Sequence, residues 1–272
     1  MLDFNQYMDK LSIIKVLSFF LLLILFFTLI PMVLDFSMGS LIFKLFLYGI
    51  MLVFFVYKLK DIIFRESDGE DSLILCLRRN YDSIFDVANI YQISFIVIAN
   101  ILFVALVFFV LTYLSNLSVI QFDSHLFGDF SFLSADILFL YLLTVVILSP
   151  IIEELLFRGI FLRRFNQELD NLTFAIIISS VLFGLCHGFG GILGAILFGI
   201  CVSILYVKSG NILVPIFAHF LNNLISFLLA FSGIEYFIYN NQIIIVLIIV
   251  LAIVSNIVLF RAIFKEWPQK FD

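Results

Sequence analysis

The chain has 272 residues, of which 64% are hydrophobic and 13% are charged, and its formal net charge is -5. A soluble domain is about half apolar, so this composition excludes an ordinary soluble protein and is typical of a polytopic membrane protein surrounded by membrane lipid. The small negative charge also excludes the basic surface that nucleic-acid binding needs, and we expect no nucleic-acid partner.

Long apolar segments recur along the whole chain. A spanning helix needs about 20 mostly apolar residues. The predicted fold is therefore all-α, a single integral membrane domain over residues 1–272, built as a polytopic membrane bundle of about eight transmembrane helices. The predicted spans lie at residues 11–34, 41–57, 92–115, 134–158, 172–189, 191–208, 211–231 and 242–263. The longest polar stretch, residues 58–91, is predicted to be a cytosolic loop with a short amphipathic helix near residues 73–90.

The placement of lysine and arginine predicts the orientation of these spans. If the N-terminus is cytosolic, all of the 15 basic residues except Lys44 fall in segments on the cytosolic side. Basic residues concentrate on that side of multi-pass proteins. We therefore expect a multi-pass protein of the cell membrane with both termini in the cytosol.

Three predicted spans carry polar side chains at membrane depth, where such groups are costly and usually mark a functional site. They are Glu153, Glu154 and Arg158 in the fourth span, His187 in the fifth, and His219 and Asn223 in the seventh. Residues four apart share a helix face, so Glu154 is placed to pair with Arg158, while Glu153 points about 100° away. Pro150 and Pro215 precede these groups, and each predicts either an ordinary kink or a local opening that admits water.

The depth of these residues supports a shared site. Glu153 and His187 lie equally far along the chain from Asp170, in the turn that joins the fourth and fifth spans. In an antiparallel pair of helices they therefore reach the same height. Helical rise also places His219 at a similar depth from its own cytosolic end. The sequence thus predicts one polar level in the cytosolic half of the membrane.

This set of side chains is suited to peptide hydrolysis. That reaction needs an activated water, a stabilised oxyanion and a proton for the leaving amine. Glu153 with His187 can activate the water. His219 and Asn223 can donate hydrogen bonds to a developing oxyanion, and Arg158 can fix the second acid in place.

A metal site is an alternative use of the same residues. Glu153, His187 and His219 match the two-histidine, one-glutamate ligand set of hydrolytic zinc, with the remaining acid as base. However, the chain contains no H-E-x-x-H sequence. Zinc is therefore an alternative that the sequence does not require, and the cofactor stays open.

Three motifs together resemble a known family. Glu-Glu-x-x-x-Arg at 153–158, Phe-x-x-x-His at 183–187 and His-x-x-x-Asn at 219–223 resemble the motifs of the CPBP intramembrane proteases, a family also called CAAX protease and bacteriocin-processing, or Abi. The resemblance covers residues 140–230. It implies an intramembrane endopeptidase of eight helices, of metalloprotease or glutamate type, whose catalytic core spans about 134–231 and which hydrolyses a peptide bond of a peptide or protein substrate.

The resemblance also implies residue roles and a group of relatives. It implies that Glu153 and His187 activate water, and that His219 and Asn223 stabilise the oxyanion. Eukaryotic relatives trim prenylated C-termini, whereas bacterial relatives are linked to bacteriocin self-immunity and peptide processing. The abundance of Phe, Ile and Asn, as in an AT-rich genome, favours the bacterial group.

Two other functions stay open at this point. Membrane-embedded acids and histidines also relay protons in transporters. A proton-coupled transporter would more often show its polar groups in two pseudo-symmetric halves, whereas here they cluster in three spans. A non-catalytic immunity or scaffold protein could retain the same motifs for binding alone.

Overall fold

The computed structural model describes residues 40–65, 87–122 and 134–270, together with residues 12, 14, 15 and 18. All regular secondary structure in these residues is helical, which confirms the predicted all-α membrane bundle. The first predicted span, 11–34, lies almost entirely outside the described residues. The same is true of most of the amphipathic helix predicted near 73–90.

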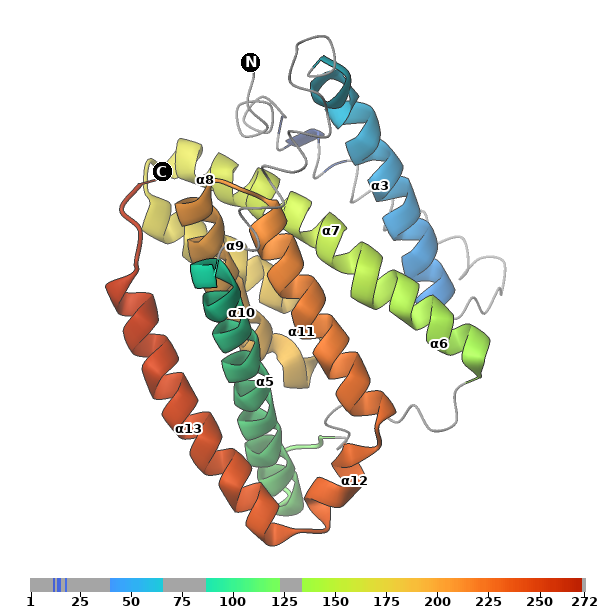
Figure 1. Ribbon diagram of the computed structural model, residues 1–272, viewed down its shortest axis with the longest axis vertical. Coiled ribbons are helices and arrows are strands. Elements are labelled where there is room, and N and C mark those ends of the chain that lie inside the picture. The colour runs from blue at the N-terminus through green and yellow to red at the C-terminus, as the bar shows by residue number, and fades with distance from the viewer. Residues whose placement is uncertain are drawn as a thin grey trace.

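Thirteen named elements follow one another along the described chain. The first two are α3 (Ser40–Arg65) and α5 (Val87–Asn116). A long rod follows, made of α6 (Ala135–Tyr141), η2 (Leu142–Leu148), α7 (Ser149–Glu154), η3 (Leu155–Leu162) and α8 (Arg163–Leu169). The remaining elements are α9 (Leu172–Leu185), η4 (Phe189–Gly191), α10 (Ile192–Ser209), α11 (Leu213–Phe231), α12 (Ile234–Tyr239) and α13 (Gln242–Lys265). In Figure 1 the rod from α6 to α8 runs obliquely across the bundle. Helix α3 lies on one side of the rod, and α5 and α13 lie on the other.

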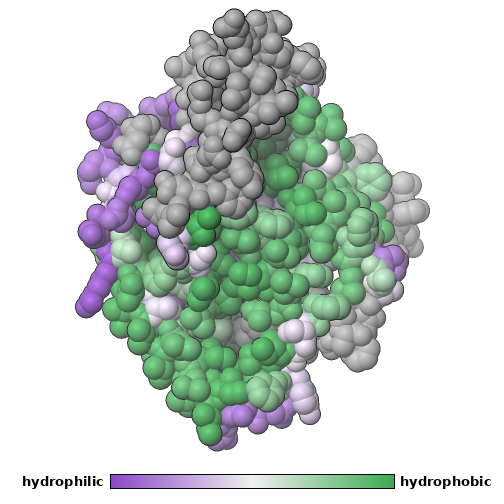
Figure 2. All heavy atoms as spheres, viewed as in Figure 1, coloured by the Kyte–Doolittle hydropathy of each residue, from purple (hydrophilic) through white to green (hydrophobic). Residues whose placement is uncertain are grey.

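Several of these helices are long and apolar enough to cross a membrane. In the described part of the chain there are five, at Ile90–Asn116, Ala135–Leu169, Phe189–Ser209, Leu213–Phe231 and Gln242–Lys265. Two further apolar helical stretches, Lys44–Tyr57 and Leu172–Leu185, are shorter. Green apolar side chains cover the middle of the face in Figure 2, and purple hydrophilic ones gather toward its ends. The protein is therefore a multi-pass membrane protein.

Two predicted boundaries were wrong. The fourth span, predicted to end at residue 158, continues as helix to Leu169 and stops where Asp170 adopts a left-handed backbone with φ of 46°. The fifth, predicted to reach residue 189, ends at Leu185 after 14 residues. That helix is about 21 Å long, less than the roughly 30 Å of the hydrocarbon core. The helix ends before a glycine-rich segment. His187 therefore lies in the turn after the helix.

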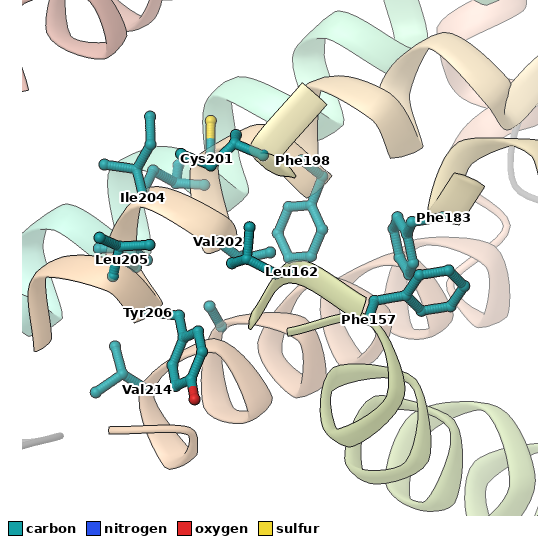
Figure 3. Packing of buried hydrophobic residues seen from close by; sticks show 14 of the residues in the cluster. Phe157, Leu162, Phe183, Phe198, Cys201, Val202, Ile204, Leu205, Tyr206 and Val214 are labelled. Carbon is teal, nitrogen blue, oxygen red and sulfur yellow. The ribbon is translucent and has the colours of Figure 1, made fainter. Parts of the chain in front are cut away.

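The predicted close hairpin between the fifth and sixth spans is confirmed as the pair α9 and α10. A Cβ atom added to Gly184 would lie 2.3 Å from Cγ1 of Ile196 and 3.0 Å from the carbonyl oxygen of Ile192. The helices can approach this closely only because the glycine has no side chain. Beside the hairpin the rings of Phe157 and Phe183 pack edge to face with centroids 5.2 Å apart, as Figure 3 shows. This apolar cluster joins the rod to the hairpin.

One end of the bundle gathers the termini of α10 and α13 and the start of α9. Lys208 at the end of α10 forms an ion pair with Glu266, just after α13. The indole nitrogen of Trp267 donates to the hydroxyl of Thr173 over 3.0 Å. Basic side chains of the described residues at or near this end are Arg163, Arg164, Lys208 and Lys265. This grouping is what the predicted orientation requires, and the assignment of this end to the cytosol stays a prediction.

Candidate active site

The rod is wound as a wider π-helix on both sides of its two acids. Segments η2 and η3 flank the short α7 that carries Glu153 and Glu154. Single turns of π-helix inside α-helices are frequent at functional sites. Pro150 contributes to the irregularity, because proline has no N–H and its ring collides with the carbonyl four residues earlier. The polar residues therefore lie on a helix whose regular hydrogen bonding is interrupted.

The interruption leaves one carbonyl open to a side chain from another helix. The N–H of Ser149 donates to the carbonyl of Thr144, five residues back, and Pro150 has no N–H to give. The carbonyl of Val145 therefore loses its regular helical donor. The Nδ2 atom of Asn223 on α11 donates to it over 2.9 Å. A buried carbonyl without a donor is costly, so this bond stabilises the interrupted helix.

Glu154 is the centre of a fully buried charge cluster. Its Oε1 atom accepts a hydrogen bond from Nη1 of Arg158 at 3.0 Å and contacts Nδ1 of His219 at 2.8 Å. The Glu154 and Arg158 side chains are 0% exposed and His219 is 3% exposed. Because Oε1 already accepts from the guanidinium, the proton of the second contact lies on Nδ1 of His219. Oε1 of Glu154 thus connects the rod to α11.

Arg158 continues the cluster toward the α9–α10 hairpin. Its Nη2 atom donates to the carbonyl of Gly199 over 3.0 Å, and its guanidinium carbon lies 4.6 Å from the centre of the Phe183 ring. A Cβ atom on Gly199 would lie 3.1 Å from Nη2 and 3.2 Å from the backbone of Ser180. Gly199 thus leaves the space that the guanidinium occupies.

Glu153 occupies a different, partly exposed environment. The hydroxyl of Tyr48 on α3 donates to Oε1 of Glu153 over 2.7 Å, and the hydroxyl of Ser149 donates to the same oxygen. The two hydroxyls lie 3.4 Å apart. No donor among the described residues contacts the other oxygen, Oε2, which leaves that oxygen available for other chemistry.

His187 faces this second environment. Its Nδ1 atom lies 2.9 Å from the carbonyl of Phe183 and must donate to it, since a carbonyl only accepts. In a neutral imidazole the Nε2 atom then carries the lone pair. The centre of the imidazole ring lies 4.7 Å from the centre of the Phe183 ring, with the two planes tilted by 59°. Glu153 and Arg158 lie within electrostatic range of the ring.

Three amides form a chain that ends at the interrupted helix. Nδ2 of Asn100 on α5 donates to Oδ1 of Asn222 over 3.1 Å, and Nδ2 of Asn222 donates to Oδ1 of Asn223 over 3.4 Å. Asn223 then donates to Val145, as described above. Asn222 and Asn223 therefore each accept from the preceding amide and donate to the next group, while Asn100 contributes only its donor.

The six predicted site residues are thus placed in one connected region. Arg158 and His219 each bond to Glu154, and the bond between Glu154 and Arg158 was predicted. Glu153 and His187 lie in electrostatic range of each other. Asn223 bonds to the backbone of the rod instead of to an acid or a histidine. Their catalytic roles stay predictions.

The residues do not form the zinc ligand set that was considered as an alternative. Both histidines hold Nδ1 on an oxygen acceptor, an arrangement that metal-binding histidines also show. However, no three His, Cys, Asp or Glu side chains converge as metal ligands in residues 40–65, 87–122 and 134–270. His219 contacts Glu154 in place of Glu153. We therefore derive no chemical step through a metal ion.

Some site residues could not be identified from the sequence motifs. Tyr48 and Ser149 supply the hydroxyls on Glu153, Gly199 makes room for Arg158, and Asn100 begins the amide chain. Only Ser149 carried a usable signal, because it lies four residues before Glu153 and so shares its helix face. Tyr48 and Asn100 are distant in sequence and carry no such signal.

Comparisons with known proteins agree with the resemblance seen in the motifs. The family model described as type II CAAX prenyl endopeptidase Rce1-like matches residues 135–225, which confirms the predicted family resemblance over that segment. "Putative membrane peptidase YdiL" of Bacillus subtilis (strain 168) is 38% identical over 78 residues, which are 28% of this chain and 32% of that relative. The chain therefore spans less than a third of the length of this relative. No solved structure matches the chain significantly.

Proposed function

We propose, from the family match over residues 135–225, that the chain is an intramembrane endopeptidase which hydrolyses a peptide bond of a peptide or protein substrate. The matched segment contains all six predicted site residues, five of them on helices of the membrane bundle and His187 in the turn that follows α9. The family match supports the general function of a membrane peptidase. The water-activating residues, the oxyanion donors and the substrate are the parts of the proposal that need experiment.

The observation that carries the proposal is the separation of two adjacent acids into two environments. Glu154 is fully buried and bonded to Arg158 and His219. Glu153 is partly exposed, has one oxygen without a donor among the described residues, and lies in electrostatic range of His187. Neighbouring carboxylates in contrasting environments take different roles in acid–base catalysis. In this proposal Glu154 organises the site and Glu153 is the base.

The water-activating step uses Glu153 and His187. Oε2 of Glu153 takes a proton from water as the water oxygen attacks the carbonyl carbon of the substrate. Because Nδ1 of His187 donates to Phe183, its Nε2 lone pair is left to accept a hydrogen bond from the same water. Protonated Glu153 can then deliver its proton to the leaving amine.

The oxyanion step places a requirement on His219. Its Nδ1–H is engaged by Glu154, so a neutral His219 offers only a lone pair at Nε2. To donate to an oxyanion from Nε2 it must carry protons on both nitrogens. Asn223 keeps a second N–H of its amide after the bond to Val145, and that N–H can also donate.

Replacement of Glu153 by glutamine tests the proposal. Peptides and proteins of the cell envelope are compared by mass spectrometry in cells that express the wild type, Glu153→Gln or the control Glu168→Gln. Glu168 is an exposed acid on α8, so its loss removes the same charge without touching the site. We expect some cleavage products to be present in cells with the wild type or the control and absent from cells with Glu153→Gln. Identical peptide profiles for all three proteins would contradict the proposal.

The finer assignments also belong to this proposal. We place the protein in a bacterial cell membrane with both termini in the cytosol, and its substrates among peptides processed in the envelope or bacteriocins against which it protects. The basic residues at the Lys208–Glu266 end of the bundle support this orientation. The identity of the products found in the comparison above would distinguish peptide processing from self-immunity.

A further inference from the structure

Tyr48 reaches the site from a helix outside the segment that matches the family. Helix α3 packs on α6, η2 and α7 of the rod. Along it, Tyr48, Met51 and Phe55 lie three and four residues apart and so share one face. Met51 and Phe55 are 5% and 1% exposed, which shows that this face is the one buried against the protein. Tyr48 therefore presents its hydroxyl to the rod, where it meets Glu153.

Two hydroxyls converge on a single carboxylate oxygen. Each oxygen of a carboxylate has about two lone-pair sites for hydrogen bonds. On Oε1 of Glu153 one site accepts from Tyr48 at 2.7 Å and the other accepts from Ser149. A hydroxyl has one proton to give, so the bond of Ser149 to Glu153 leaves its 3.4 Å contact with Tyr48 as a secondary one. Both acceptor sites of Oε1 are then occupied.

This occupancy decides which oxygen of Glu153 can act as the base. With Oε1 saturated, a proton taken up by the carboxylate goes to Oε2, the oxygen without a donor among the described residues. We propose that Tyr48 is a positioning residue, which together with Ser149 holds Glu153 so that Oε2 alone faces the reacting water. The inference rests on the proposed function, since it names how the same site orients its base. In the reaction one O–H bond of water breaks, the proton goes to Oε2, and the water oxygen bonds to the substrate carbonyl carbon.

Charge supports the positioning role. A carboxylate that accepts two hydroxyl hydrogen bonds keeps a fixed orientation with little rotational freedom, and hydrogen bonds to charged groups are roughly twice as strong as neutral ones. A tyrosine buried only for packing would need some acceptor for its hydroxyl, but it would not need the acceptor to be the candidate base. The two roles differ in what happens to Glu153 when the hydroxyl is removed.

The test is Tyr48→Phe, which removes the hydroxyl and keeps the ring. Infrared difference spectra between each protein and its Glu153→Gln derivative isolate the carboxylate stretching band of Glu153. We expect Tyr48→Phe to move this band from its wild-type position. We also expect the Glu153-dependent envelope peptides to accumulate about 10- to 100-fold more slowly, the range for loss of one hydrogen bond to a charged group.

A matched control is Tyr113→Phe, which removes the hydroxyl of an exposed tyrosine on α5. It should leave both the band and the rate unchanged. Ser149→Ala empties the other acceptor site of the same oxygen and should also move the band, so the inference can be judged even if Tyr48→Phe folds poorly. An unmoved band in both site variants would overturn the positioning role. If the wild-type protein generates no Glu153-dependent peptides but the band still moves in the site variants, the proposed function is refuted. The role of Tyr48 in holding Glu153 then remains intact.

Discussion

Replacement of Arg158 by methionine tests whether the buried charge cluster is held by that guanidinium. Arg158 and Glu154 are both 0% exposed, so water cannot take the place of the lost cation. Methionine keeps an unbranched apolar stem of similar length, which limits the change to the charge and the hydrogen bonds. The substitution therefore leaves a carboxylate buried beside His219 with no guanidinium.

The expected cost follows from the contacts that are lost. Removal of one partner of a buried ion pair costs about 3–5 kcal/mol, because the other charge stays buried without compensation. The contact with the Phe183 ring at 4.6 Å adds up to about 2 kcal/mol when desolvated. The carbonyl of Gly199 still accepts from the hydroxyl of Ser203 at 2.7 Å. Loss of its hydrogen bond from Arg158 therefore adds little to the cost in stability. We expect the free energy of unfolding to fall by at least about 3 kcal/mol, set by the ion-pair contribution.

The measurement is reversible unfolding in mixed detergent micelles, followed by the loss of helical circular dichroism. Arg261→Met, on the exposed face of α13, is the control and should change stability by less than about 0.5 kcal/mol. A double variant, Glu154→Gln with Arg158→Met, removes both charges and should regain a large part of the loss, because no charge is left buried. The reasoning is refuted if Arg158→Met loses less than about 1 kcal/mol, or if the double variant is no more stable than the single one.

Three further predictions follow from the same structure. In a double-mutant cycle, Asn100→Leu should slow cleavage in the wild type and have no further effect in Asn223→Ala, since it acts through the amide chain; additive effects would contradict this. Cleavage by the purified protein should persist after extensive chelation, because no three-ligand metal set is present in the described residues, and lasting loss that zinc restores would contradict this. The hydrogen bond from Lys208 holds the pKa of the Glu266 carboxyl below its usual range, so the ion pair is present at neutral pH and is lost as the pH falls through that lowered value. Fluorescence of Trp267, the chain's single tryptophan, should therefore change as the pH falls into the acid range, and Lys208→Gln, which leaves no ion pair to break, should remove that change.

The helices could be predicted from the sequence because their signal is local. An apolar run of the right length is sufficient to predict a spanning helix, and seven of the eight predicted segments coincide with helices in the described residues. Their ends were predicted less well. The polar residues of α8 stay helical beyond the predicted boundary, and α9 stops early before glycines. Hydrophobicity indicates what enters the membrane, whereas the end of a helix depends on backbone hydrogen bonds that hydrophobicity does not describe.

The candidate site could be predicted only where the residues in contact are close together in the sequence. The Glu154–Arg158 pair is four residues apart on one helix, so helical geometry predicts it directly. The contact of His219 with Glu154 was not predicted, since His219 was assigned to the oxyanion and only His187 was paired with an acid, Glu153. Its prediction requires the relative rotation of α11 and the rod. The π-helical turns change that rotation, and nothing in the pattern of apolar residues marks them.

The two acids also differ in which part of the chain builds their surroundings. Arg158, His219 and Gly199, which hold Glu154, all lie within residues 135–225, the segment that matches the family. Glu153 depends in addition on Tyr48, which lies outside that segment. The contacts of Glu154 therefore all come from the matched segment, while the orientation of the proposed base depends on a helix outside that segment. Relatives with the same three motifs but a different residue facing Glu153 should differ in the rate of cleavage, because the hydrogen bonds that orient the base differ.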